Sequence, residues 1–194
     1  MAGVKDLAVT LARRVLENVG SVDEGELEAF VEAVGFAARV FVVGAGRSGL
    51  VARAFAMRLM HLGMQVYVVG ETITPAIGPG DLLVAVSGSG ATRSVVLVAG
   101  TARRMGARVA AVTSHGESQL ARLADVVLVV GGREEGAERD YMSEQLRGFS
   151  VSPTPLGTLF ELSASVVLDA VVAALMEKRG VGEEVLRARH ANLE

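Results

Sequence analysis

Short apolar runs alternate along this chain with longer segments whose apolar residues recur every three or four positions. The short runs predict five strands, at residues 39–43, 65–69, 82–86, 108–112 and 125–130. The longer segments between them predict helices, at residues 48–62 and 94–105. Strands that alternate with helices of ten or more residues are typical of a parallel sheet covered by helices on both faces.

Further helices are predicted before and after this alternation. Apolar residues from Val4 to Leu16 recur with helical spacing, and this first helix is expected to end near Gly20. Ser21, followed three residues later by Glu24, resembles a capping box and predicts the start of a second helix. Two helices therefore precede the first strand.

A long apolar helix is predicted near the other end of the chain, with Thr154 as its N-cap and Pro155 at its first position. Residues 156–176 have the length of a membrane span and are interrupted only by Glu161 and Asp169. Each acid would cost about 2.5–3.5 kcal/mol at the centre of a bilayer. We therefore interpret this segment as a helix buried in the protein or in a subunit interface, and expect no membrane association.

These elements predict one α/β domain, residues 1–194. We expect a three-layer α-β-α sandwich with a five-stranded parallel sheet, of the flavodoxin-like kind. Its parts are two N-terminal helices (1–37), a strand and helix core (38–132), a charged loop (133–152), and C-terminal helices with a tail (153–194). A connection as long as the charged loop is either a functional lid or a mobile segment, and the sequence leaves both alternatives open.

The composition narrows the functions that the chain can have. A hydrophobic fraction of 51% is high for 194 residues, which indicates that apolar surface is covered between subunits. The net charge of −3, with scattered basic residues, excludes a nucleic-acid footprint. Cysteine is absent and the three histidines lie far apart in sequence, so neither a thiolate nor a metal site is expected. Without an uninterrupted apolar segment near the N-terminus, we expect a cytoplasmic protein.

The loop that follows the strand at 82–86 carries the strongest chemical signal. It reads Ser87-Gly-Ser-Gly-Ala-Thr92 and leads into a helix. The glycines permit close approach of the backbone, and the hydroxyls of Ser87, Ser89 and Thr92 lie where free helical N–H groups collect. A loop of this kind predicts an anion site, with phosphate as the expected ligand.

A second glycine loop, from Gly44 to Gly49, follows the first strand and has two interpretations. Its G-x-G-x-x-G spacing, with Glu71 near the end of the next strand, favours a dinucleotide site and an NAD-dependent dehydrogenase. That interpretation leaves the hydroxyls of the other loop unexplained. In the alternative, both loops hold a small phosphorylated ligand from two sides, with Ser48 donating hydrogen bonds and Arg47 supplying charge.

Glu161 is the candidate general base. Its helix neighbours are small or apolar, and a carboxylate in such a position is unfavourable unless it has a partner. Removal from water makes a carboxylate a stronger base, as proton transfer from carbon requires. The alternative for Glu161, and also for Asp169 on the same helix, is a buried salt bridge.

Two histidines are further candidates. His61 ends the helix that follows the first glycine loop, where the helix dipole explains a histidine as well as a catalytic role does. His190 belongs to the C-terminal tail. His115 is interpreted as a loop residue.

Several stretches of the sequence together resemble one protein family. Resemblance to the sugar isomerase (SIS) domain signature is carried by the run VSGSGATRSVVLVAGTARRMGARVAAVTS. Resemblance to the 6-phospho-3-hexuloisomerase family is carried by GAGRSGLVARAFAMRLMHLG, GETITPAIGPGDLL, PLGTLFE and the terminal HANLE. The match extends over essentially the whole chain and is weakest at residues 133–152. Ala91 departs from the glutamate that the family often has, without affecting a catalytic role.

The resemblance implies a ketose-phosphate isomerase, which is an intramolecular oxidoreductase. Members of this family interconvert D-arabino-hex-3-ulose 6-phosphate and D-fructose 6-phosphate through a 2,3-enediolate, with no cofactor or metal. Glu161 would shuttle the proton, while Arg47 and either His61 or His190 would stabilise the oxyanion or help to open the sugar ring. The phosphate would be held by Ser48, Ser87, Ser89 and Thr92.

The resemblance also implies partners. It predicts a homo-oligomer, a dimer or tetramer, in which a histidine enters the site of the neighbouring subunit. It points to 3-hexulose-6-phosphate synthase, which supplies the substrate in the ribulose monophosphate pathway, as a functional partner. Another SIS phosphosugar isomerase, an NAD-dependent dehydrogenase and a non-catalytic sugar-phosphate sensor stay open as alternatives. The sensor is disfavoured because roughly 35 residues before the first strand are too few for a DNA-binding domain.

Overall fold

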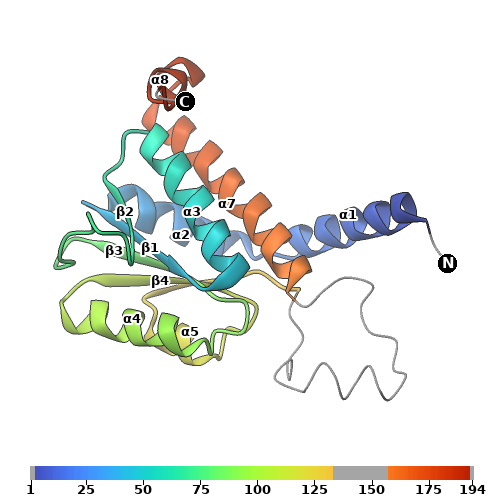
Figure 1. Cartoon of the computed structure of the whole chain (residues 1–194), viewed down its shortest axis with the longest axis horizontal. Helices are drawn as coiled ribbons and strands as arrows, with labels where there is room; N and C mark the ends of the chain where they lie inside the picture. The colour runs from blue at the N-terminus through green and yellow to red at the C-terminus, as the bar shows by residue number, and fades with distance from the viewer. Residues whose placement is uncertain (1–2, 133–156, 193–194) are drawn as a thin grey trace.

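Five parallel strands form the centre of the molecule. The structure, a computed structural model, describes residues 3–132 and 157–192. The strand order is β2-β1-β3-β4-β5 (Figure 1). The strands are β1 Val40–Gly44, β2 Val66–Val68, β3 Leu82–Val86, β4 Arg108–Thr113 and β5 Val126–Val129. Every strand boundary lies within one residue of its predicted position, and the predicted five-stranded parallel sheet is confirmed.

Helices cover both faces of the sheet, as the predicted three-layer sandwich requires. In Figure 1, α4 and α5 lie below the sheet, and α3 and α7 lie above it. The upper layer also contains α2, which packs against β5. The helices are α1 Val4–Gly20, α2 Glu24–Phe36, α3 Gly46–His61, α4 Arg93–Arg104, α5 Gln119–Leu123, α7 Thr158–Arg179 and α8 Glu183–Ala188.

The strand β3 shows why its sequence is apolar without interruption. Leu82, Val84 and Val86 pack into the core formed with α2, α3 and α7. Leu83 and Ala85, which point to the other face, pack into the core formed with α4 and α5. All five residues are buried, because a central parallel strand has no face in water.

The start of α2 differs from the prediction. Asp23 is the N-cap, and its side chain accepts a hydrogen bond of 2.9 Å from the backbone N–H of Glu26. Ser21 is instead the C-cap of α1, in right-handed helical conformation, and its hydroxyl donates to the carbonyl of Asn18. The predicted capping box at Ser21 and Glu24 is therefore wrong, because the hydroxyl of Ser21 is directed back to the preceding helix.

The helix α7 is the long apolar helix of the prediction. It is long and apolar enough to cross a membrane by length and composition alone, but half of its most apolar window is buried inside the protein. Phe160, Leu168 and Leu175 belong to the upper core. Asp169 is exposed, so the buried salt bridge considered for it is wrong. The predicted N-cap and first residue, at positions 154 and 155, lie outside the described residues.

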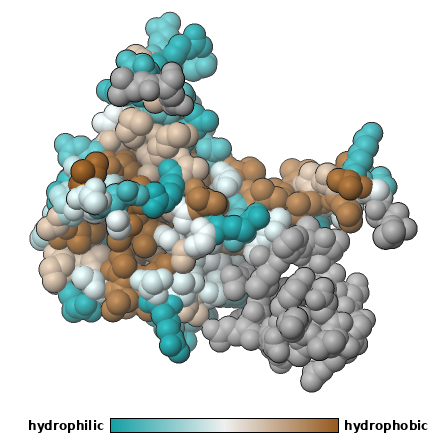
Figure 2. All heavy atoms as spheres, in the orientation of Figure 1, coloured by the Kyte–Doolittle hydropathy of each residue, from teal (hydrophilic) through white to brown (hydrophobic). Residues whose placement is uncertain are grey.

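The helix α1 projects from the body of the protein toward the N-terminus (Figure 1). None of its residues is buried, although Val4 and Leu16 are apolar and are 85% and 73% exposed. Figure 2 shows apolar side chains along this helix. The C-terminal half of α1 packs against α7, where Leu11, Val15 and Val19 are partly buried, whereas Val4 and Leu16 lack a cover within the described part of the chain.

An ion pair joins the amino ends of β1 and β3. Arg39 Nε donates to Asp81 Oδ1 at 2.8 Å and Nη2 donates to Oδ2 at 2.6 Å. Asp81 is only 3% exposed and also accepts a hydrogen bond from the backbone N–H of Gly78. The hydrogen bonds from Arg39 lower the pKa of Asp81 below its ordinary value, and they outweigh the opposite effect of burial.

We predict that Asp81→Asn lowers the free energy of unfolding at pH 7 by roughly 1.5–3 kcal/mol, since it removes a charge-assisted hydrogen-bond pair. Because the pKa of Asp81 is lower in the folded chain, this stabilisation is complete above the unfolded value of about 3.9. It is lost as the pH falls through the folded value. Urea unfolding of both proteins at neutral and strongly acidic pH should show the difference shrinking in acid; an unchanged difference would contradict the assignment.

Candidate active site

The first glycine loop holds the start of α3 against the end of β1. A Cβ atom on Gly44 would lie 2.8 Å from the backbone N of Gly49, and one on Gly49 would lie 2.8 Å from the carbonyl O of Gly44. Neither residue can therefore carry a side chain. Gly46, with φ +56°, has open space around it. Backbone packing thus explains the outer two glycines of the G-x-G-x-x-G pattern without a dinucleotide.

Glu71 has a partner within the protein. Its carboxylate forms an ion pair with the guanidinium of Arg53 from α3, and both side chains are about half exposed. The acid that the dehydrogenase interpretation assigned to a ribose is therefore engaged in a surface ion pair.

The two glycine loops lie side by side, as the sequence predicts. The strand order reverses direction between β1 and β3, and in open parallel sheets such a switch point opens a crevice at the carboxyl ends of the strands. Gly44, the last residue of β1, is paired in register with Val86, the last residue of β3. The loops that follow these residues therefore flank one crevice, and they contribute Arg47 and Ser48 on one side and residues 87–92 on the other.

The hydroxyls of the second loop are close together. Ser87, 3% exposed, has its Oγ 3.0 Å from Thr92 Oγ1. Ser89 is partly exposed, and its Oγ accepts a long hydrogen bond from the backbone N–H of Ala91. Thr92 is the N-cap of α4, but its side chain does not cap the helix. The start of α4 is thus left without the internal side-chain acceptor that helix N-termini commonly have.

The short helix α5, which was not among the predicted helices, supports this loop. Gly90 has φ +59°, and a Cβ on it would lie 2.0 Å from Ser118 Oγ, so this position also requires glycine. The backbone N–H of Leu120 in α5 donates to the carbonyl of Gly90. Ser118 caps α5 by accepting from the N–H of Ala121. A helix of five residues is too short to show an apolar period, and its capping serine is the only signal in the sequence.

Glu161 and Arg47 form an ion pair at the same edge of the sheet. Arg47 Nε donates to Glu161 Oε2 at 2.8 Å. Glu161 is 8% exposed, whereas the arginine side chain is 55% exposed. Ser48, adjacent to Arg47 in the first turn of α3, is also buried. The structure therefore brings together three predicted site residues, and the partner of the buried carboxylate comes from the first glycine loop.

Gly157 limits the space on the other side of the carboxylate. It is the N-cap of α7 with φ +84°, a left-handed conformation. A Cβ on this residue would lie 2.8 Å from Glu161 Oε1. The absence of a side chain at Gly157 therefore leaves room for the carboxylate oxygen that Arg47 does not contact.

The two candidate histidines contact each other and lie far from this pair. The rings of His61 and His190 are stacked, with centroids 5.2 Å apart. His61 is buried at the C-terminal end of α3, and its pKa is lowered by burial and then by the nearby His190 and Arg58. The 16 residues of α3 extend about 24 Å, and Arg47 lies in its first turn. Within one chain the histidines therefore lie at the far end of α3 from Arg47 and its partner Glu161.

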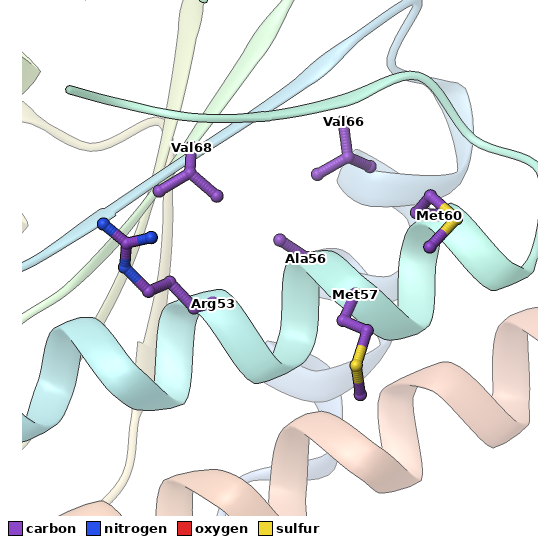
Figure 3. A pocket seen from close by; sticks show the side chains of 6 residues that line it. All are labelled: Arg53, Ala56, Met57, Met60, Val66 and Val68. Carbon is purple, nitrogen blue, oxygen red and sulfur yellow. The ribbon is translucent and has the colours of Figure 1, made fainter. Parts of the chain in front are cut away.

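A groove of about 330 Å³ lies between α3 and the edge strand β2 (Figure 3). It is lined by Arg53, Ala56, Met57, Met60, Val66 and Val68. None of the predicted site residues contributes to it. Among residues 3–132 and 157–192, no three His, Asp or Glu side chains are arranged to hold a metal ion.

A family model of the SIS domain matches residues 37–142, more than half of the chain. The chain belongs to the SIS domain family. This match contains both glycine loops but ends before Glu161. The family model therefore covers the two loops that flank the crevice, and only the similarities to longer stretches of the chain include Glu161.

Longer similarities extend through α7. The chain is 40% identical over 190 residues to the 3-hexulose-6-phosphate isomerase of Methylomonas aminofaciens, with 98% of each chain covered. It is 43% identical to the 3-hexulose-6-phosphate isomerase of Mycobacterium gastri, covering 93% of this chain and 86% of the other. A crystal structure from Methanococcus jannaschii, from which a 3-hexulose-6-phosphate isomerase function was inferred, superposes with a TM-score of 0.77 at 32% identity, covering 95% and 97% of the two chains.

We predict that Gly157→Ala destabilises the protein in two separable ways. The left-handed conformation disfavours alanine by about 1–2 kcal/mol, and the new methyl group displaces the Glu161 carboxylate. In a Glu161→Ala background only the conformational effect should remain, so Gly157→Ala should lower the free energy of unfolding by less there. Urea unfolding of the four proteins measures this difference.

Gly180 provides the matched control. It also has a left-handed conformation, φ +61°, at the end of α7, but a Cβ there meets no atom within 4 Å. Gly180→Ala should therefore lower the free energy of unfolding by the same amount in the wild type and in the Glu161→Ala variant. If Gly157→Ala also lowered the free energy of unfolding equally in the wild type and in the Glu161→Ala variant, the methyl group would not disturb the carboxylate.

Proposed function

We propose that this protein is a sugar-phosphate isomerase that interconverts D-arabino-hex-3-ulose 6-phosphate and D-fructose 6-phosphate. The observation that carries the proposal is the buried carboxylate of Glu161, paired with Arg47 beside the two glycine loops. The similarity to 3-hexulose-6-phosphate isomerases over nearly the whole chain supports the choice of substrate.

The phosphate group would bind to the second glycine loop. Ser87, Ser89 and Thr92 supply hydroxyls there, and the N-terminus of α4 adds backbone N–H groups and the positive end of the helix dipole. Ser48, at the start of α3, faces the same crevice from the neighbouring loop and completes the proposed phosphate site. A 12-residue helix supplies a dipole large enough for this role.

The reaction requires the transfer of one proton between adjacent carbons. The Glu161 carboxylate removes the proton from C2 of the 3-ketose, and the electrons of that C–H bond form the C2–C3 double bond while the C3 carbonyl oxygen becomes an oxyanion. The hydroxyl proton on O2 then passes to O3. Glu161 returns its proton to C3, which leaves the carbonyl at C2 and the base unchanged.

Arg47 has two roles in this proposal. Without substrate, its guanidinium neutralises the buried Glu161 and so offsets the unfavourable burial of an unpaired carboxylate. With substrate bound, the same guanidinium stabilises the enediolate oxyanion, because the charge moves from the carboxylate to the sugar during the reaction. The half-exposed arginine side chain has the freedom to follow this charge.

We predict that Glu161→Gln lowers kcat by ~10²–10⁴-fold and leaves KM nearly unchanged, since the amide preserves shape but cannot accept the proton. The reaction is run without NAD and stopped, and the fructose 6-phosphate formed from the 3-hexulose phosphate is then quantified separately. Asp169→Asn is the matched control, because Asp169 is exposed on the same helix and should retain wild-type kinetics.

A sugar-phosphate sensor would give a different result in the same assay. It would bind the sugar phosphate with no turnover in the wild-type protein. A dehydrogenase would require NAD for any consumption of substrate. Wild-type turnover without NAD, strongly lowered in Glu161→Gln, therefore separates the proposed function from both alternatives.

We propose further that the protein works as a homo-oligomer with shared active sites, in the cytoplasm, and receives its substrate from 3-hexulose-6-phosphate synthase. This proposal is supported by large apolar side chains on the outer surfaces of α1, α3 and α7. They include Leu16, Leu50, Met57, Leu162 and Val166, which are 37–73% exposed in the single chain. A second copy would cover these residues and would allow His61 or His190 to reach the Glu161 site of its neighbour, as one chain alone does not.

Complementation tests the shared site. If a histidine acts in trans, Glu161→Gln mixed with His61→Gln or with His190→Gln should recover part of the wild-type activity after mild denaturation and reassociation. In a hybrid pair of subunits, one site would then have both an intact Glu161 and an intact histidine, and the other site would have neither. At most half of the sites would therefore be active. Native mass spectrometry confirms that hybrids form. Hybrids that stay inactive with both histidine variants would show that the site belongs to one chain.

A further inference from the structure

The hydroxyl of Thr158 is buried without a hydrogen-bond partner. Thr158 is 7% exposed, and its Oγ1 is the one buried side-chain oxygen or nitrogen in the described residues that forms no hydrogen bond. A buried hydroxyl that has lost its water and gained no partner destabilises a fold. A valine would fill the same volume without this disadvantage, which makes the hydroxyl a candidate for a contact with a ligand.

The helix that carries Thr158 offers no internal explanation. Thr158 is the first residue of α7, so no preceding helical turn supplies a carbonyl to its hydroxyl. The N-cap position belongs to Gly157, and no side chain caps the helix. The hydroxyl thus takes no part in the local hydrogen bonding that usually explains a threonine at a helix start.

Thr158 lies next to the carboxylate of Glu161. The two residues are three positions apart on α7 and therefore share a face. Helical side chains lean toward the N-terminus, which places the Glu161 carboxylate over the first turn. The close approach of its Oε1 to the position of a Cβ on Gly157 agrees with this placement. Although the hydroxyl is nearby, Oε2 accepts its hydrogen bond from Arg47 and not from Thr158.

We infer that Thr158 binds the sugar end of the substrate, through a hydrogen bond to an oxygen on one of the two carbons between which the proton moves. This inference rests on the proposed function. The second glycine loop has hydroxyls of its own for the phosphate, whereas Thr158 is beside the proposed base.

A threonine hydroxyl suits this position for a chemical reason. In the proposed reaction, each of the two substrate oxygens is a carbonyl on one side of the equilibrium and a hydroxyl on the other. A hydroxyl side chain donates to a carbonyl and can rotate to accept from a hydroxyl, so one residue serves both substrate and product. A carboxylate at this position could accept from the hydroxyl but could not donate to the carbonyl, so it would serve only one of the two states.

The experiment compares Thr158→Val with Thr158→Ser. Thr158→Val removes the hydroxyl and keeps the volume, so we expect kcat/KM to fall roughly 10–100-fold, because a substrate oxygen is left unpaired in the site. The melting temperature should be equal to or higher than that of the wild type, since the unpartnered hydroxyl is gone. Thr158→Ser should restore kcat/KM to within about threefold of the wild type.

A matched control removes a threonine hydroxyl elsewhere. Thr101 lies in α4, and its Oγ1 donates to the carbonyl of Leu97 in the same helix. Thr101→Val should leave kcat/KM unchanged. If Thr158→Val also had wild-type kcat/KM, or if it lowered the melting temperature while Thr158→Ser failed to restore kcat/KM, Thr158 would have only a structural role and the inference would be overturned. If Thr158→Val does not fold, Thr158→Ala is measured in its place.

Ligand-induced stabilisation separates this inference from the proposed function. Inorganic phosphate should raise the melting temperature of the wild type and of Thr158→Val equally, whereas fructose 6-phosphate should give a further increase only in the wild type. Loss of the inorganic phosphate effect in Thr158→Val would place the residue in the phosphate site and overturn the inference. If the wild type does not isomerise the hexulose phosphate, the proposed function fails, and the fructose 6-phosphate comparison still decides whether Thr158 binds a sugar.

Discussion

The contact between Gly44 and Gly49 is the constraint on which the proposed site depends. It lets the first turn of α3 lie directly against the last residue of β1, at a separation that would leave a Cβ only 2.8 Å from backbone atoms. Arg47 and Ser48 lie between these two glycines in sequence, so their positions at the crevice follow from the same contact. A side chain at either glycine would push α3 outward and would separate Arg47 from Glu161 on the neighbouring helix.

The burial of Glu161 then determines what surrounds it. A carboxylate that is 8% exposed needs a positive partner or a proton, and Arg47 supplies the charge at 2.8 Å. The pair joins the first turns of α3 and α7, which both begin at the carboxyl edge of the sheet. An ion pair in which only the arginine reaches water can open without exposing the carboxylate. This asymmetry allows Glu161 to alternate between a guanidinium and a substrate as its partner.

Regular features of the chain could be predicted from the sequence, and contacts between distant residues could not. Buried strands have no polar alternation, so the five apolar runs located the sheet to within one residue. Hydroxyls and glycines after β3 predict a phosphate site because that chemistry is local, and phosphate binding there stays a prediction. The capping box at Ser21 failed because a serine hydroxyl can bond backward as well as forward. The partner of Glu161, 114 positions away, and the unpaired hydroxyl of Thr158 depend on tertiary packing, to which no sequence period corresponds.

The positions of the histidines connect the site to the assembly. His61 and His190 stack on each other at the end of α3 that is about 21 Å from Arg47, a distance that no side-chain rotation covers. At the same time, α1 projects from the body with large apolar side chains uncovered, as do the outer faces of α3 and α7. A second copy that packs on these helices would remove apolar surface from water and would also bring a new end of α3 toward the crevice. The proposed association would thus cover the exposed apolar helices and would also bring the distant histidines within reach of a neighbouring crevice.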